Sequence, residues 1–182
     1  MSHPAPDPPE TAENTAKAEV RGLAFSGNHL LPADRWAVWE ALNDPAVLKA
    51  CIAPAEKLTR PAPDRIEATV AVGLGPLKAR FKGDLVLENV SPAERYTMRV
   101  KGKGGLFGRI AVLIHVDMSD APMDDRMDGQ VDGGPGTRLI WIASADLKGW
   151  LAAKGQKLLS ATVERHVAGF FDDLLDHLPP RR

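Results

Sequence analysis

The sequence has almost none of the residues from which metal sites and disulfides are built. Its 182 residues include one cysteine, Cys51, which excludes an internal disulfide and multi-cysteine zinc motifs and fits a reducing compartment. The five histidines form no H-x-x-x-H or H-E-x-x-H pair of the kind that binds zinc on a helix. The acidic run 124–129 fails as a calcium loop because Arg126 takes a ligand position and no glutamate closes the loop. We therefore expect no metal site.

Long apolar runs and an excess of one charge are also missing. No apolar stretch approaches the roughly 20 residues of a membrane span, and the formal net charge is -1, which does not indicate a nucleic-acid-binding protein. The N-terminus has neither the basic start nor the apolar segment of a secretory signal. From composition we expect a soluble, cytoplasmic protein.

Composition divides the chain into one domain and two tails. Residues 1–20 are rich in Pro, Ala, Glu and Thr and nearly free of large apolar side chains, which predicts a disordered segment. We expect a single folded domain over residues 21–178 and a short C-terminal tail over residues 179–182.

Alternating apolar and polar residues predict a series of antiparallel strands. The strands are expected near residues 25–31, 66–72, 77–88, 96–103, 110–116 and 139–145, with a turn at Ser91-Pro92-Ala93 and a long acidic, glycine-rich loop over 119–136. Two short helices are predicted between the first strands, the second capped by Asp44 and begun by Pro45.

The C-terminal stretch from Gly149 to Leu178 contains no proline and carries apolar residues at helical spacing. Pro179 then ends it. Strands grouped together and followed by a long amphipathic helix predict an α+β fold, in which a curved antiparallel sheet wraps around that helix.

Three strings carry a family resemblance: AFSGNHLLPADRWAVWEALNDPAVLKACI (24–52), IEATVAVGLGPLKARFKGDLVLENVSPAERYTM (66–98) and GKGG (102–105). They resemble the carbon monoxide dehydrogenase CoxG family, in the SRPBCC or START-like superfamily, whose fold is called helix-grip. The resemblance covers residues 23–178 and is strongest up to Gly105. Residues 118–136 look like a longer insertion than is usual in this family.

The resemblance implies a non-enzymatic accessory protein with no covalent cofactor. Its partners would be a molybdenum-containing CO dehydrogenase-like enzyme, an anionic membrane surface and an apolar lipid, menaquinone or ubiquinone, held under the long helix. Some relatives carry a further C-terminal segment taken as a membrane anchor. This sequence ends in LPPRR, so only peripheral membrane contact is expected.

Inward-facing residues of the predicted sheet and helix would line the lipid cavity, or, in the alternative interpretation, fill an ordinary core. Small residues at the start of the helix favour space there, whereas Val167, Phe170, Phe171 and Leu174 indicate solid packing. The predicted cavity residues are Trp39, Leu77, Phe81, Leu85, Tyr96, Met98, Val100, Leu106, Phe107, Trp141, Ala152, Gly155, Leu159 and Val163.

Basic residues on the outward faces predict a contact with a membrane or an acidic partner, or else a solvated sheet face. A turn at residues 91–93 would bring Lys82 near Lys101 and Arg80 near Lys103. Aromatic residues do not interleave with these cations, which argues against nucleic acid. The contact residues are expected to be Lys78, Arg80, Lys82, Lys101, Lys103, Leu106 and Phe107, the last two in a glycine-rich loop that could act as a gate.

Two rival functions remain open. A polyketide cyclase or aromatase on the same fold would need polar groups inside the cavity, for which only Tyr96, Thr162 and His166 are candidates. A pure assembly scaffold would have a filled core. The sequence nominates no catalytic residue.

Overall fold

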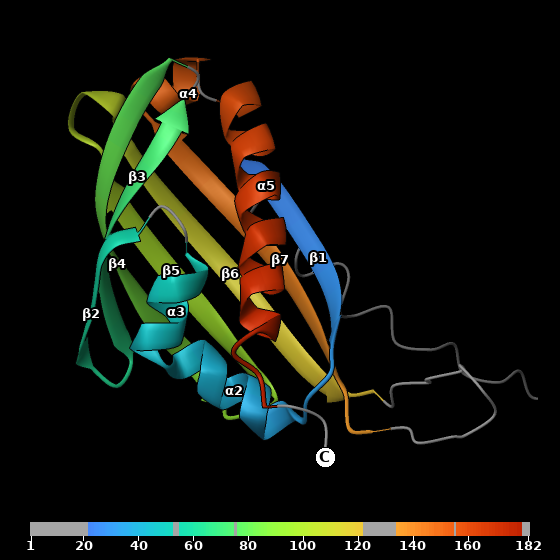
Figure 1. The fold of residues 1–182 in the computed structure, drawn as a ribbon. Helices are drawn as coiled ribbons and strands as arrows, with labels where there is room; N and C mark the ends of the chain where they lie inside the picture. The colour runs from blue at the N-terminus through green and yellow to red at the C-terminus, as the bar shows by residue number, and fades with distance from the viewer. Residues whose placement is uncertain (1–21, 53–54, 75, 122–133, 155, 180–182) are drawn as a thin grey trace, which may run out of the picture.

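The computed structural model describes residues 22–52, 55–74, 76–121, 134–154 and 156–179, which form an antiparallel sheet with helices on its concave side (Figure 1). The seven strands follow the order β1-β7-β6-β5-β4-β3-β2. Their bounds are β1 Leu23–Leu31, β2 Ala55–Ala62, β3 Arg65–Leu74, β4 Leu77–Ser91, β5 Arg95–Lys103, β6 Arg109–Asp120 and β7 Thr137–Lys148. The predicted α+β helix-grip fold is confirmed.

The helices lie at the two ends of the sheet and across its face (Figure 1). They are α2 Arg35–Asn43, α3 Pro45–Cys51, the 3-10 turn η1 Gly105–Phe107, α4 Trp150–Lys154 and α5 Gln156–Leu175. As predicted, the Asp44 side chain caps α3 by accepting from the Ala46 N–H at 2.7 Å, and Pro45 begins the helix. The single helix expected from residue 149 is instead assigned as α4 and α5, and residue 155 between them lies outside the described residues.

Two buried clusters hold the helices to the sheet. The lower cluster surrounds α2, α3 and the C-terminal end of α5, where Val38 and Leu174 are fully buried and Phe170 and Phe171 pack alongside. The upper cluster consists of Ala79, Phe81 and Leu151, with α4 as its cover. Burying a leucine side chain stabilises the fold by roughly 1.5–3 kcal/mol, so these clusters fix both ends of the helical layer.

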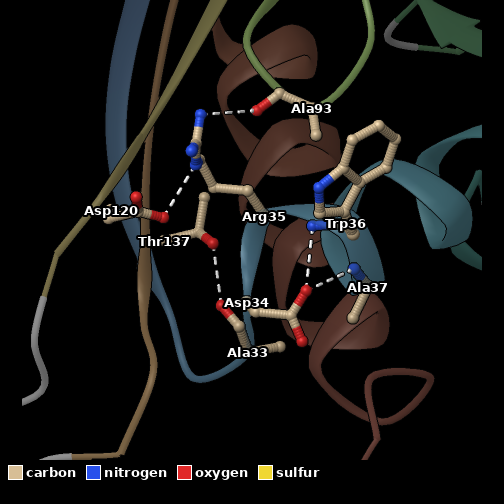
Figure 2. Close-up of polar contacts among 8 residues, drawn as sticks. All are labelled: Ala33, Asp34, Arg35, Trp36, Ala37, Ala93, Asp120 and Thr137. Carbon is tan, nitrogen blue, oxygen red and sulfur yellow. Dashed lines mark hydrogen bonds and ion pairs between the residues drawn. The ribbon is translucent and has the colours of Figure 1, made fainter.

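The start of α2 is joined to distant strands by polar contacts (Figure 2). The Asp34 carboxylate accepts from the N–H groups of Trp36 at 2.9 Å and Ala37 at 3.0 Å, as an N-cap should. Arg35 bonds Asp120 at the end of β6 at 2.7 Å, but exposed ion pairs of this kind contribute little. The Thr137 hydroxyl donates to the Ala33 carbonyl at 2.7 Å, and Thr137 is fully buried.

Replacing Thr137 by valine should destabilise the protein by about 1–3 kcal/mol, because it leaves the Ala33 carbonyl buried without its donor. The midpoint of urea-induced unfolding measures this change. Thr137→Ser is the matched control, since it keeps the hydroxyl and loses only a methyl group. Equal unfolding midpoints for the valine and serine variants would show that this hydrogen bond contributes nothing.

Candidate functional site

An apolar cavity of about 140 Å³ lies between the concave face of the sheet and α5. Its walls come from the inward residues of β1, β6 and β7 and from α5, and every described lining residue is apolar. The lining residues are Leu23, Phe25, Ile110, Val112, Ile114, Trp141, Ala143, Ala145, Leu147, Val163 and Val167.

Two alanines on β7 explain why the space exists. The inward residues of this strand include Trp141, Ala143, Ala145 and Leu147, so small side chains stand between large ones. In the strand register Ala143 lies between Phe25 and Ile114, and Ala145 lies between Leu23 and Val112. A methyl group at each of these positions leaves room above the sheet that Val163 and Val167 of α5 do not fill.

Of the cavity residues expected from the sequence, Trp141 and Val163 belong to the described lining. Trp39, Tyr96 and Met98 pack in the lower cluster, and Phe81 and Phe107 pack in the upper one.

The other predicted cavity residues lie elsewhere. Leu85 and Val100 face each other across β4 and β5 but do not belong to the described lining. Ala152 is exposed, and Leu106 is 98% exposed. Gly155 and the side chains of Leu77 and Leu159 lie outside the described residues.

The distribution along the helix also differs from the prediction. Leu174 packs solidly, and His29 of β1 stacks on Phe171 with ring centroids 3.5 Å apart. Val167, expected to belong to this solid half, lines the cavity instead. Period-two alternation identifies all the inward residues, but it does not say which part of the sheet faces α5. The local signal was the pair of alanines between Trp141 and Leu147.

Titratable groups inside the protein lie away from this space. Burial raises the pKa of Tyr96 above its usual value and lowers the pKa of His29 below its usual value. Neither belongs to the described lining, and nor do Thr162 and His166. The described walls of the cavity are therefore apolar and provide no acid or base.

Within the described ranges, no group of three or more His, Cys, Asp or Glu side chains could hold a metal ion. In the same residues no helix is long and apolar enough to cross a membrane.

The outer face of the sheet carries a row of cations that we call the basic row: Lys82, Lys103, Arg109 and Lys148. The strand register places each directly opposite the next, across β4, β5, β6 and β7. All four side chains are exposed, and none forms an ion pair with another described residue. Like charges opposite one another destabilise a sheet, so the basic row lowers the stability of the isolated protein.

Other arginines on the sheet are neutralised. Arg80 bonds both carboxylate oxygens of Glu56, at 2.6 and 2.9 Å, and its hydrogen bond lowers the pKa of that carboxyl group. Arg99 bonds Glu88 in the same two-pronged way, at 3.0 Å for each contact, and Arg65 bonds Asp84 at 2.5 Å. The four cations of the basic row, by contrast, lie opposite one another and have no carboxylate partner among the described residues.

The pairings expected for the basic residues were wrong by two residues. Lys82 pairs with Lys103, and Lys101 faces Asp84. The reason is the turn, which is centred on Ala93 with a φ of 59° and has a register shift between Glu88 and Ser91. Arg109 and Lys148 were not predicted, because they join the row only through the pairing of β5 with β6 and of β6 with β7.

The loop between β5 and β6 separates its two large side chains. Leu106 points to solvent, whereas Phe107 contacts Trp150 of α4 edge-on, with ring centroids 5.7 Å apart. In the sequence this loop stands between Lys103 and Arg109. An exposed leucine therefore lies at the end of the sheet that carries the basic row.

Comparison with solved structures agrees with the fold. A conserved protein from Geobacillus kaustophilus is 25% identical, with a TM-score of 0.70 over 85% of this chain and 93% of that one. A protein from Rhizobium loti is 17% identical, with a TM-score of 0.59 over 86% and 96% of the two chains. The Zhui aromatase/cyclase from Streptomyces sp. R1128 is 14% identical, with a TM-score of 0.58 over 85% and 92%.

Sequence comparison is more specific. No curated protein matches the chain. The family model for the CoxG subunit of carbon monoxide dehydrogenase, however, matches residues 27–178, which includes most of the domain and all of the helical layer. The resemblance seen in the sequence is thereby confirmed, and the chain belongs to the carbon monoxide dehydrogenase CoxG family.

Proposed function

We propose that this protein is a non-enzymatic accessory factor that holds the apolar part of a membrane quinone between β7 and α5. It would serve a molybdenum-containing, CO dehydrogenase-like enzyme at the membrane. The observation that carries the proposal is the cavity, whose described lining is entirely apolar. Family membership supports the association with a CO dehydrogenase-type enzyme.

The size of the cavity limits what it can hold in this conformation. A dry apolar cavity of about 150 Å³ binds a molecule the size of benzene, and this one measures about 140 Å³. Pockets for larger ligands span roughly 300–1,000 Å³. One ring or one branched segment of an isoprenoid chain therefore fits, and the rest of a lipid quinone would extend beyond this space.

Docking at a membrane is supported by where the basic row lies relative to the cavity. Arg109 and Lys148 point outward, and their chain neighbours Ile110 and Leu147 point inward and line the cavity. These cations and one end of the cavity therefore lie at the same place along β6 and β7, on opposite faces of the sheet. Each cation near an anionic surface contributes about 1 kcal/mol, and Leu106 beside them could enter the lipid interface.

The two alternative functions require different properties of the cavity. A cyclase would need acid–base groups on the cavity wall, and the described lining includes none of Tyr96, Thr162 and His166. A pure scaffold would bind its partner enzyme equally well with the cavity filled. The first experiment below also separates the carrier from the scaffold.

Replacing Ala143 by leucine should reduce quinone binding at least tenfold, because the larger side chain occupies the space that the ligand needs. Native mass spectrometry with added menaquinone or ubiquinone measures the bound fraction. The stability should not fall, since the cavity has room for the added carbons.

Ala168→Leu is the matched control for this experiment, because Ala168 is an exposed residue of α5. It should bind quinone as the wild type does. If the wild type binds no quinone, or if the two leucine variants bind equally, the carrier proposal is wrong. Unchanged binding of the partner enzyme by Ala143→Leu, with no quinone in any sample, would favour the scaffold.

Removing two cations of the basic row should weaken binding to anionic vesicles. The double variant Lys103→Gln with Arg109→Gln loses about 2 kcal/mol of attraction, which corresponds to roughly 30-fold weaker partitioning. Flotation with phosphatidylglycerol-containing vesicles measures it. The control removes the same two residue types from exposed positions elsewhere, Lys49→Gln with Arg138→Gln. Equal losses in both double variants would mean that net charge matters and this surface does not.

A further inference from the structure

The basic row presents an evenly spaced line of positive charge. Its four residues stand in register on β4, β5, β6 and β7, and neighbouring strands are about 4.8 Å apart. Alternate cations, such as Lys82 and Arg109, are therefore about 9–10 Å apart, and the whole row extends over about 14 Å. No described carboxylate pairs with the row, so its charge is available to a further anionic group.

The chain carries acidic residues at a matching spacing before β1. Residues 1–16 include three acidic side chains, Asp7, Glu10 and Glu13, and no lysine or arginine. The three acids recur at every third position, and prolines occupy positions 4, 6, 8 and 9. Proline favours the polyproline II conformation, which has three residues per turn. In that conformation, which rises about 3.1 Å per residue, the three carboxylates share one side and are about 9 Å apart.

The described chain begins close to the basic row. Gly22 lies against β7, where an added Cβ would be 2.0 Å from the Ala145 carbonyl oxygen, and Lys148 is at the end of the same strand. From the strand spacing and the rise per residue, Gly22 is about 12 Å from Arg109. Even as a random coil, a chain of nine residues spans roughly 15–18 Å. Glu13 is nine residues before Gly22 and is therefore within reach of the row.

Access to the outer face from this point is direct. β1 is an edge strand of the described sheet, so no further strand of that sheet separates the chain before Gly22 from the outer face. On the inner face the same end of the sheet is covered by α4, through the cluster that contains Leu151. The outer face is therefore the accessible one for the acidic residues.

We propose that residues 7–13, the acidic segment, are the intramolecular occupant of the basic row and compete there with anionic lipid. This inference rests on the proposed function, because it describes how the same membrane-contacting surface is regulated. Carboxylates at the spacing of alternate cations face two of them at once. The acidic segment relieves the repulsion among the cations in the free protein, and a membrane surface with many anionic headgroups displaces it.

Attachment to the same chain makes a weak contact effective. Exposed ion pairs are individually weak, but a short tether holds the acidic segment near the row at a millimolar effective concentration. The contact therefore forms in the free protein and still yields to a membrane. Added salt should weaken it, because the Debye length shortens from about 10 Å at 0.1 M to about 3 Å at 1 M.

Neutralising the acidic segment should strengthen binding to anionic vesicles. The acid-free variant, Asp7→Asn with Glu10→Gln and Glu13→Gln, removes the competitor and leaves the basic row unchanged. We expect it to partition about fivefold more strongly into phosphatidylglycerol-containing vesicles, measured by flotation of the full-length protein at 0.1 M salt.

The matched control makes the same change in net charge at a distance from the row. It removes three exposed carboxylates in and just after α5, by Glu164→Gln with Asp172→Asn and Asp176→Asn. Because α5 lies on the concave face of the sheet (Figure 1), screening over the intervening distance should keep vesicle binding near the wild-type value. An equal increase in the control and the acid-free variant would show that net charge alone is responsible and would overturn the proposal.

A spin label tests the contact without any membrane. Thr11→Cys places the label between Glu10 and Glu13, and the native Cys51 is buried and therefore reacts slowly. In nitrogen-15 NMR of the full-length protein, the label should broaden the amide signals of the basic row at low salt. The broadening should disappear at 1 M salt and when the three acids are neutralised.

The outcomes separate this inference from the proposed function. No broadening of the row, or broadening that persists without the three acids, would overturn the intramolecular contact. Broadening of an unlabelled nitrogen-15 copy by a labelled copy would assign the acidic segment to a second molecule and would also overturn it.

The vesicle measurement then decides what the contact does. If the contact forms and the wild type and the acid-free variant bind vesicles equally, the competition is wrong and membrane docking stands. If the contact forms and neither protein binds vesicles, docking through the basic row is wrong and the intramolecular contact stands.

Discussion

The pairing of β7 with β1 and β6 determines both faces of this protein. On the inner face it brings Ala143 and Ala145 between the larger residues of the neighbouring strands, and a cavity results. On the outer face the same pairing continues the row from Arg109 to Lys148. Because successive side chains point to opposite faces, a one-residue slip would move the alanines outward and the cations inward. One register therefore fixes the cavity and the basic row together.

The cavity persists because the helical layer is held at its ends. Leu174, Phe171 and the helices α2 and α3 anchor one end of the layer, and Leu151 anchors the other through Phe81 and Ala79. Between these clusters, α5 lies over the part of the sheet that contains Ala143 and Ala145. Closing the gap would require α5 to sink toward the alanines, and both clusters would then lose their packing. The well-packed clusters at the two ends of the helical layer therefore keep the cavity between them from closing.

Much of the fold could be predicted from the sequence because the signals are local. Alternation identified the strands, and the Asp44-Pro45 pair located the start of α3, since each depends only on residues close in the chain. The hairpin of β2 and β3 was less clear, because β2 contains Pro61 and has little alternation. Which residues face each other depends on turn geometry. The positive φ of Ala93 shifted the β4–β5 pairing by two residues from the prediction.

The candidate site was harder to predict, because a cavity is a property of packing between distant segments. Tyr96 and Met98 have the same inward pattern as Ile114 and Val112, yet α2 and α3 cover the first pair and α5 spans the second. A list of inward residues therefore finds the interior and cannot divide it into filled and open parts. Side-chain size along one strand does carry that information, since two small residues between two large ones mark the place where a covering helix cannot make contact. In β7 this pattern occurs at Ala143 and Ala145, between Trp141 and Leu147. The open part of the interior can thus be located from one short segment of the chain.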